Sequence, residues 1–367
     1  MANMTPPTAP PFCPNSNCRF HKADRRHWRF IRKGYFVSGG RRRTSTQRYR
    51  CLQCGRSFSD RTFRAGYWLK RPRLLARIAR RLVGCSGYRQ IARELAISPQ
   101  TVARHAARLG RHSLLFHVSK LRGRPIQEPA ALDSFQSFEY SQYYPTLYHL
   151  VVGRESHFCY GFTDSECRRS GRMTARQKQR RAELERMRGR PDPRSIEMEV
   201  AALLRTVAPA PQALDLFSDE HQDYPRAMRR VPHLAITHGT ISSRAARIPA
   251  NPLFAINLID GLIRHSSANH KRESIAFSKK RESAIHRLWL FLAWRNYDKS
   301  FSEKKRGPTP AQRAGIMDRR WSLRRILGRR LFPTRIRLPK RWRIYYEGGT
   351  ITRAYGPSHA RALRYAM

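Results

Sequence analysis

Two short apolar runs near the middle of the chain each end in an aspartate. The first run covers residues 130–133 and ends at Asp133, and the second covers 213–219 and ends at Asp219. A strand that ends in a carboxylate carries that group to the rim of its sheet. Two such strands, followed by a helix with further polar groups, supply the oxygen ligands that divalent metal ions need for phosphoryl transfer. The pattern therefore predicts a metal-dependent phosphoryl-transfer site.

Four cysteines near the start of the chain form two pairs. Cys13 and Cys18 are separated by four residues, whereas Cys51 and Cys54 enclose a tight Leu-Gln knuckle. Two such pairs can place four thiolates tetrahedrally around Zn²⁺, which holds together a segment too small to fold alone. The residues on either side of the second pair have the strand-turn-strand pattern of a zinc ribbon. We therefore expect a structural zinc site.

Other side chains near these cysteines leave the ligand set open. His21 and His27 lie close by in the sequence and are alternatives to one of the thiolates. Cys85, Cys159 and Cys167 have no metal-ligand spacing, and we interpret them as small apolar residues.

The composition indicates a polyanionic partner. The chain has 74 Lys and Arg against 25 Asp and Glu, a formal net charge of +49, so it repels itself unless a polyanion or counterions neutralise it. Nucleic acid is the natural partner. The longest apolar run, 288–294, is far shorter than the roughly 20 residues of a membrane-spanning helix, and residues 1–12 lack a secretory pattern. We therefore expect a cytoplasmic, nucleoid-associated protein with no membrane partner.

Residues 88–105 have the pattern of a helix-turn-helix. Their apolar positions allow two short helices to pack across a turn at 96–98, where Ser98 can cap the second helix and Pro99 suits its first position. The second helix of this motif places its N-terminal side chains in the major groove. The predicted DNA contacts are Gln100, Thr101 and Arg104 for base edges, and Arg108 and Arg111 for phosphates. An ordinary basic helical hairpin is the alternative.

The central region has the element order of a ribonuclease-H-like domain. We expect three strands at 130–139, 146–152 and 157–163, an amphipathic helix near 196–204, a strand ending at Asp219, and a further short strand at 233–237. A helix over 251–267 would place Asn257, Asp260 and Arg264 on one face, because they are three and four residues apart.

The order of zinc ribbon, helix-turn-helix and acid-tipped strands resembles the DDE transposases of bacterial insertion sequences. Two local motifs carry the resemblance. Ser218-Asp219-Glu220-His221, with Tyr224 close behind, is similar to the block around the second acid of that family. Residues 275–279, followed by a helix that ends at 295–297, are similar to the region after the third acid. The resemblance covers most of residues 13–300.

The resemblance implies roles for the acids. Asp133 and Asp219 would be the first two ligands of Mg²⁺ or Mn²⁺. The position where the family usually carries a glutamate corresponds to Asn257, a poor metal ligand. Asp260, one turn further on, and Glu273 are the two candidates for the third acid, and an incomplete, inactive site is the remaining alternative.

The predicted architecture is a multidomain α/β protein. The expected segments are a disordered stretch (1–12), a zinc ribbon (13–66), a helix-turn-helix domain (67–120), a linker (121–129), a ribonuclease-H-like domain (130–303) and a basic C-terminal extension (304–367). Within the extension we expect an amphipathic helix over 319–332 and a hairpin over 342–353, turning at two glycines.

Three functions are compatible with these features. The first is a transposase that binds the terminal inverted repeats of a mobile element and cuts and joins double-stranded DNA at its ends and target, as a homodimer or higher oligomer. The second is a domesticated, catalytically inactive DNA-binding regulator. The third is an RNA-binding protein that stacks unpaired bases on the tyrosines of residues 139–148.

Overall fold

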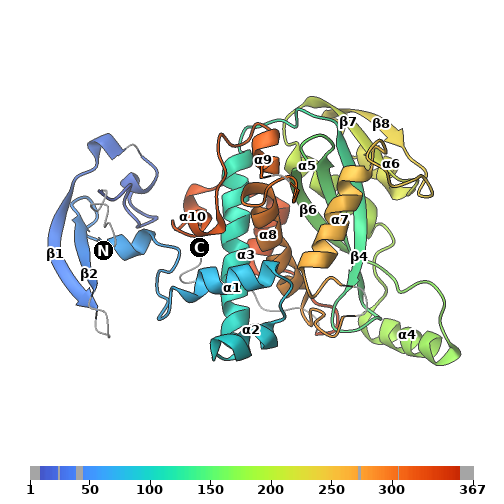
Figure 1. Cartoon of the computed structure of the whole chain (residues 1–367), viewed down its shortest axis with the longest axis horizontal. Coiled ribbons are helices and arrows are strands. Elements are labelled where there is room, and N and C mark those ends of the chain that lie inside the picture. Colours follow the sequence, from blue (N-terminus) through green and yellow to red (C-terminus); the bar gives the residue numbers. More distant parts are fainter. Residues whose placement is uncertain (1–8, 24, 39–43, 272–273, 305, 356–367) are drawn as a thin grey trace.

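The computed structural model describes residues 9–23, 25–38, 44–271, 274–304 and 306–355. Figure 1 shows a small sheet at one end of the molecule, a layer of helices in the middle and a larger sheet beyond them. Two sheets and eleven α-helices lie in the described residues, which confirms the α/β class. None of the described helices is long and apolar enough to cross a bilayer.

The strands are β1 (Phe30–Ser38), β2 (Thr44–Cys51), β3 (Ser57–Ser59), β4 (Ala130–Phe138), β5 (Pro145–Gly153), β6 (Cys159–Glu166), β7 (Gln212–Ser218) and β8 (Leu234–Thr240). The helices are α1 (Leu74–Val83), α2 (Tyr88–Leu95), α3 (Pro99–Leu121), α4 (Ala175–Arg188), α5 (Ser195–Val207), α6 (Asp223–Arg229), α7 (Phe254–Ser266), α8 (Arg281–Tyr297), α9 (Pro310–Arg313), α10 (Leu323–Ile326) and α11 (Lys340–Glu347).

The small sheet has the antiparallel order β1-β2-β3. Its own buried cluster is limited to Cys13, Cys18, Phe20, Trp28, Tyr49, Cys51 and Phe58. A core of this size is too small to stabilise a folded unit by apolar burial alone. The cysteines among its members are therefore the natural source of the missing stability.

The larger sheet has the order β6-β5-β4-β7-β8. Strands β4, β5 and β6 form an antiparallel meander, whereas β7 and β8 run parallel to β4. Helix α5 packs on β5 and β6, and α7 packs on β4 and β5. Strand β5, which is in contact with both helices, is accordingly buried along almost its whole length.

The two helices and the turn predicted over 88–105 form, although the second helix has 23 residues and is not short. Ser98 caps α3 by accepting a hydrogen bond from the Thr101 backbone N–H at 3.1 Å, and Pro99 occupies the first helical position. Ala96 takes the left-handed conformation, with φ of 50°, at the turn position where glycine is common.

Helix α3 continues far beyond this motif and joins the rest of the molecule. It packs along α8, and the two backbones meet at Gly110, where an added Cβ would lie 2.5 Å from the His286 Cα. Only glycine permits so close an approach. One hydrophobic core consequently runs from α1 through α3 and α8 to the larger sheet.

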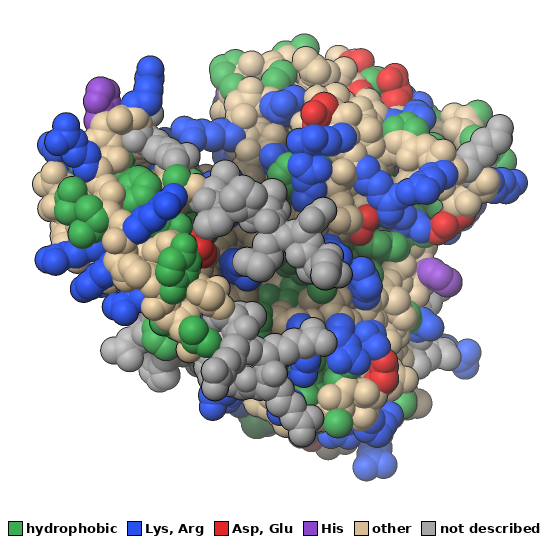
Figure 2. Space-filling view, turned by 60° about the vertical axis from the view of Figure 1, so that its left-hand side comes forward, with side chains coloured by type: hydrophobic (Ala, Val, Ile, Leu, Met, Phe, Trp, Pro, Cys, Tyr) green, Lys and Arg blue, Asp and Glu red, His purple; other side chains and the backbone are tan. Residues whose placement is uncertain are grey.

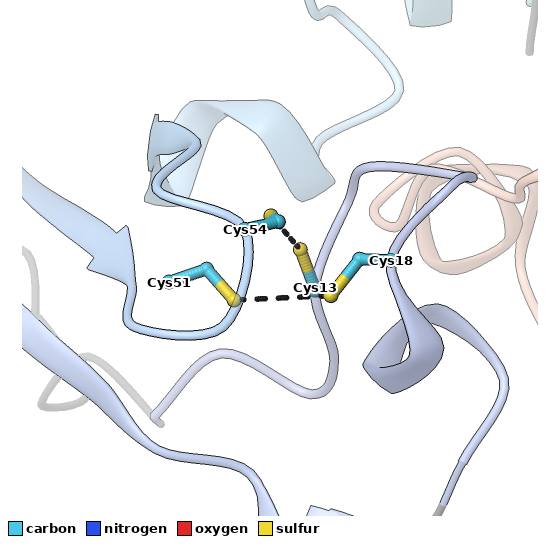
Figure 3. Close-up of side chains that lie close together, drawn as sticks. All are labelled: Cys13, Cys18, Cys51 and Cys54. Carbon is cyan, nitrogen blue, oxygen red and sulfur yellow. Dashed lines mark hydrogen bonds between the residues drawn. The ribbon is translucent and has the colours of Figure 1, made fainter.

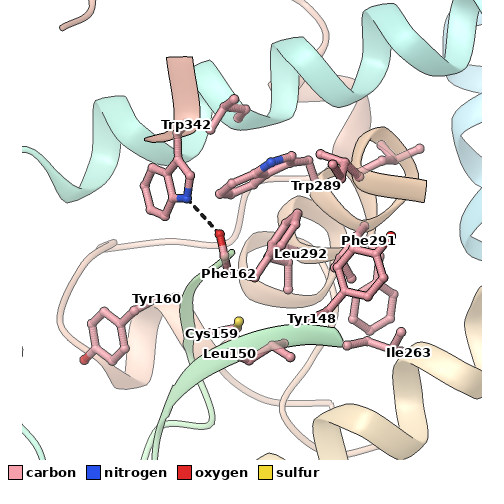
Figure 4. Close-up of a cluster of buried hydrophobic side chains, with 14 of the residues drawn as sticks. Tyr148, Leu150, Cys159, Tyr160, Phe162, Ile263, Trp289, Phe291, Leu292 and Trp342 are labelled. Carbon is pink, nitrogen blue, oxygen red and sulfur yellow. Dashed lines mark hydrogen bonds between the residues drawn. The ribbon is translucent and has the colours of Figure 1, made fainter. Parts of the chain in front are cut away.

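Residues 306–355 fold back onto this core. Trp342 of α11 is buried; its Nε1 donates a hydrogen bond to the Phe162 carbonyl at 2.8 Å, and its ring packs edge-on against Trp289 (Figure 4). The Trp342 ring also lies where a side chain at Gly161 would project. The contact therefore connects the C-terminal segment directly to strand β6.

Several local predictions differ from the structure. The hairpin over 342–353 is wrong, because residues 340–347 form α11 and Gly348, with φ of 76°, ends this helix instead of turning a hairpin. The helix over 319–332 shrinks to the single turn α10. At the start of the chain, residues 1–8 lie outside the described part, but Phe12 is buried and packs edge-on against Phe332.

Candidate active site and metal centre

The four cysteines of the small sheet converge on one point (Figure 3). The Sγ atoms of Cys13 and Cys54 are 3.6 Å apart, those of Cys18 and Cys51 are 3.9 Å apart, and all four lie within 4.8 Å of one another. Four thiolates bound tetrahedrally at about 2.3 Å from Zn²⁺ would be about 3.8 Å apart. The group therefore has the donor set and spacing to hold one tetrahedral metal ion.

Trp28 and His21 lie next to the cysteine group in different ways. The Trp28 Nε1–H donates to the Cys51 Sγ at 3.2 Å. The Nδ1 of His21 lies 2.8 Å from the Cys13 carbonyl oxygen, and its Nε2 lies 2.6 Å from the Thr334 hydroxyl. Both ring nitrogens of His21 are thus occupied, and His27 is exposed. Neither histidine replaces a cysteine in the group.

The register of the larger sheet brings Asp133 and Asp219 to the same level. Ala131 pairs with Phe217 in the parallel β4–β7 ladder, and each aspartate comes two residues later in its own strand direction. Because side chains alternate between faces with a period of two, both carboxylates project on the same side of the sheet. The hydrogen-bonded ladder between these two strands ends before this point.

The protonation of Asp133 reflects this arrangement. Burial, together with the negative charge of Asp219, raises the pKa of Asp133 to about 6. The Ser134 backbone N–H, which donates to the Asp133 Oδ1 at 2.6 Å, and the positive charge of Arg247 oppose the rise. A bound cation would remove the cost of holding the two carboxylates ionised side by side.

Asp260 comes to this pair from helix α7. It follows the apolar stripe that packs on the sheet, and burial followed by the charge of Asp133 raises its pKa well above the ordinary value, against Arg264 and Arg247. Its Oδ1 is buried and has no hydrogen-bond partner in the described structure. A buried carboxylate oxygen without a partner is costly unless a cation binds it.

None of the three aspartates forms an ion pair within 4.0 Å with a described Lys or Arg; the ion pairs of this sheet lie elsewhere, around Arg281 and Arg341. The carboxylate oxygens of the three aspartates are farther apart than the cysteine sulfurs. Among the described residues, only the four cysteines have ligand atoms that all lie within 4.8 Å of one another. Oxygen donors of this kind fit Mg²⁺ or Mn²⁺.

A network of polar side chains lies next to the aspartates. The Tyr224 hydroxyl lies 2.9 Å from the Ser134 Oγ, which lies 2.5 Å from the Nδ1 of His149. Burial lowers the pKa of His149 to about 3, so the ring is neutral and its Nε2 can exchange a hydrogen bond with the Ser165 hydroxyl at 2.8 Å. Burial, followed by the charges of Asp133, Asp219 and Asp260, raises the pKa of Tyr224. All three carboxylates therefore act on this one phenol.

Sequence reasoning missed most of this network. Ser134 and His149 lie inside apolar strands, where an isolated polar residue carries no specific signal. Tyr224 belongs to the motif around Asp219, although its role did not follow from the motif. Arg247 lies in the segment after β8, and no sequence pattern connected it to the acids.

The remaining predicted site residues are placed as follows. Asn257 lies on α7 one turn before Asp260 and is half-buried. Glu273, the alternative third acid, lies outside the described residues.

The predicted DNA contacts divide into two groups. Gln100 and Arg104 are exposed at the start of α3, and Thr101 is half-buried beside them. Arg108 donates a hydrogen bond to the Tyr67 carbonyl at 2.9 Å, and burial lowers its pKa to about 10. Burial lowers the pKa of Arg111 as well. These two arginines face the interior, which differs from the phosphate contacts predicted for them.

No protein-family model matches the chain, and no curated protein matches it. Among solved structures, it is similar to a chain in the cryo-electron microscopy structure of the simian T-cell lymphotropic virus intasome in complex with the PP2A regulatory subunit B56 gamma. The identity is 15%, the match covers 53% of this chain and 57% of that chain, and the TM-score is 0.24. The chain thus spans little more than half the length of this neighbour, and so low a TM-score supports no assignment of fold or function.

Proposed function

We propose that this protein is a transposase that cuts and joins DNA strands with the help of divalent metal ions bound by Asp133, Asp219 and Asp260. The observation that carries the proposal is that Asp219 and Asp260 both lie near enough to Asp133 for their charges to interact, whereas none of the three forms an ion pair within 4.0 Å with a described Lys or Arg. Two come from parallel strands at matching register, and the third has an unpartnered buried oxygen.

The topology of the larger sheet supports the proposal. An antiparallel meander of three strands, with two parallel strands added beside the first, is the arrangement implied by the resemblance to DDE transposases and their ribonuclease-H-like domain. In that arrangement the first acid lies on the first strand and the second acid follows the fourth strand. Asp133 on β4 and Asp219 after β7 have these positions.

The acids account for the chemistry. A pair of Mg²⁺ ions, when bound, activates the attacking oxygen and stabilises the leaving oxygen of an in-line phosphoryl transfer. The carboxylates of Asp133, Asp219 and Asp260 would hold the ions. The Ser134 and His221 backbone N–H groups orient the first two carboxylates, by donating to Asp133 Oδ1 and Asp219 Oδ1.

We expect the basic surface and the start of α3 to bind DNA. Lys and Arg side chains are spread over the face in Figure 2, where acidic side chains are few. The exposed start of α3, with Gln100 and Arg104, is the element that would enter the major groove. Pairing two DNA ends requires at least two active sites, so we propose a dimer or higher oligomer on DNA.

Strand cleavage on DNA that carries the element ends tests the proposal. With Mg²⁺ or Mn²⁺, Asp219→Asn and Asp260→Asn should each lower the cleavage rate by more than about 100-fold, since even residues that only support metal ligands cost 10- to 100-fold. DNA binding should persist in both variants. The matched control is Asp215→Asn, an exposed aspartate on β7, which should retain full activity.

Two results would contradict the proposal. Unchanged cleavage by both variants would remove these aspartates from the site. Binding of the element ends by the wild-type protein with no cleavage under any divalent cation would favour the inactive regulator.

A further inference from the structure

A basic groove lies between the small sheet and the C-terminal segment. It is lined by Lys22 near the cysteine group, Arg122 at the end of α3, Arg335, Arg337 and Arg343 from the C-terminal segment, and Glu347, with a volume of about 770 Å³. These residues come from three parts of the chain that are far apart in sequence. The predicted extension thus supplies most of a surface that no sequence motif indicated.

Among the described residues, most charges of the basic groove have no ion-pair partner. Five of its lining side chains are cationic and one is acidic, and no ion pair within 4.0 Å joins Lys22, Arg122, Arg337 or Arg343 to a described carboxylate. Another arginine-rich hollow, between α5 and α6, differs because its Glu197 pairs with Arg230. Like charges gathered without counter-charges repel one another, and an anionic ligand would relieve this repulsion.

The walls of the basic groove are held together by specific contacts. Phe332 packs against Phe12 and Phe63 of the small-sheet region, with ring centroids 5.0 and 5.8 Å apart. The Thr334 hydroxyl lies 2.6 Å from the His21 Nε2, and the Arg335 guanidinium donates to the His21 carbonyl. The groove is therefore a defined feature of the docked arrangement.

We infer that the basic groove binds the phosphate backbone of duplex DNA, as a contact separate from the helix-turn-helix. This inference rests on the proposed function, which supplies DNA as the polyanion. A volume of about 770 Å³ exceeds what one phosphate fills, and cations contributed by three segments suit a row of phosphates. The planar arginine side chains match phosphate oxygens in geometry as well as in charge.

The salt dependence of DNA binding tests the inference. The test uses a duplex of mixed sequence without added divalent cation. In the variant Arg337→Gln/Arg343→Gln, the slope of the log binding constant against log salt concentration should become less negative by about 1.8, or about 0.9 for each lost phosphate contact. Both residues are exposed, so the fold should tolerate the change. The control Arg205→Gln/Arg229→Gln removes the same charge from exposed positions on α5 and α6, away from the small sheet (Figure 1), and should leave the slope unchanged.

Three outcomes would overturn the inference: no loss of slope in the groove variant, an equal loss in the control, or a loss seen with single-stranded DNA but not with duplex. Because the acids take no part without a divalent cation, a negative cleavage result leaves this binding test valid.

Discussion

Two groups of buried or half-buried acids lie on or next to the larger sheet and differ in what neutralises them. The catalytic acids proposed here, Asp133, Asp219 and Asp260, form no ion pair with a described Lys or Arg. The second group, which we call the arginine-paired cluster, consists of Glu139, Asp164, Glu166 and Glu199 with Arg281, Arg341 and Arg353. Strand β4 carries Asp133, and Glu139 follows directly after its end, so the two groups are neighbours.

Every carboxylate of the arginine-paired cluster has a cation in reach. The Arg281 Nε lies 2.8 Å from the Glu139 Oε2, and its Nη2 lies 2.9 Å from the Glu166 Oε1. Asp164 accepts hydrogen bonds from Arg341 at 2.9 Å and from the Tyr345 hydroxyl at 2.5 Å. Burial alone therefore does not identify a functional acid. What distinguishes the proposed site is that its aspartates form no ion pair within 4.0 Å with a described Lys or Arg, although Arg247 and Arg264 act on them from farther away.

The cysteine group is a third set of buried side chains, and its donors are thiolates instead of carboxylates. Loss of one of these cysteines should have the largest effect on stability. Cys51→Ser should abolish binding of one Zn²⁺ per chain and unfold the small sheet, because structural zinc contributes about 10 kcal/mol or more and the apolar cluster there is small. Metal analysis and limited proteolysis of residues 13–63 would measure both effects. Cys159→Ala, a buried cysteine of the larger sheet, should keep its zinc; equal zinc content in Cys51→Ser and the wild type would exclude the site.

Removal of Arg281, the central cation of the arginine-paired cluster, should have the second largest effect on stability. Arg281→Met leaves Glu139, Asp164 and Glu166 with less compensation, and should lower the free energy of unfolding by about 3–5 kcal/mol. Urea denaturation would measure the loss. Arg81→Gln, which breaks the exposed pair with Glu94, should leave stability unchanged, and a similar loss in both variants would contradict the comparison.

The proposed catalytic acids should respond to pH in the opposite sense to ordinary paired carboxylates. The pKa of Asp133 is about 6 in the folded protein against 3.8 ordinarily. The folded state therefore binds this proton more tightly, and its stabilising effect is complete below pH 3.8 and disappears as the pH rises through about 6. Relative to Asp133→Asn, the metal-free wild type should lose up to about 3 kcal/mol between these limits.

Urea midpoints of the two proteins from pH 4 to pH 7, with and without Mg²⁺, would check this prediction. The divalent cation should flatten the wild-type profile, because it binds the ionised carboxylates. Parallel pH profiles for the wild type and Asp133→Asn in the absence of metal would show that folding does not raise the pKa of Asp133.

The smallest expected effect is a difference in stability between variants of two adjacent tyrosines of α11. Tyr345→Phe removes the hydroxyl that donates to the Asp164 carboxylate, and should cost about 1.5–3 kcal/mol as a hydrogen bond to a charged group. The hydroxyl of Tyr346 is buried with no hydrogen-bond partner, so Tyr346→Phe should be neutral or slightly stabilising. Thermal unfolding of the two variants compares them directly, and equal losses would show that the Asp164 bond contributes little.

Much of the fold could be predicted from local patterns. The five strands of the larger sheet lie within about two to three residues of their predicted limits, because apolar runs bounded by turns define strands locally. The start of α3 was predictable from Ser98 and Pro99, which act within one helical turn. The packing of Trp342 on Trp289 was not predictable, because contacts between distant segments leave no periodic signal. The pattern around Gly348-Gly349 was accordingly misread as a hairpin.

The site was predictable only in part. Asp133 and Asp219 stand out because apolar runs lead into them. The choice between Asn257 and Asp260 depends on the rotation of α7 about its axis, and its packing on β4 and β5 sets that rotation. The partners of the acids, such as Tyr224 and Ser134, come from different elements. Their convergence is a property of the tertiary structure.

Helix α3 has a consequence for how such a protein would measure DNA. Its 23 residues extend over about 34 Å, close to one turn of duplex, and it is one continuous helix that packs along α8. Under the proposed function, the start of α3 would read the DNA sequence, and its end leads through residues 122–129 to the strand that carries Asp133. The bond that is cut should then lie at a constant number of base pairs from the recognised sequence.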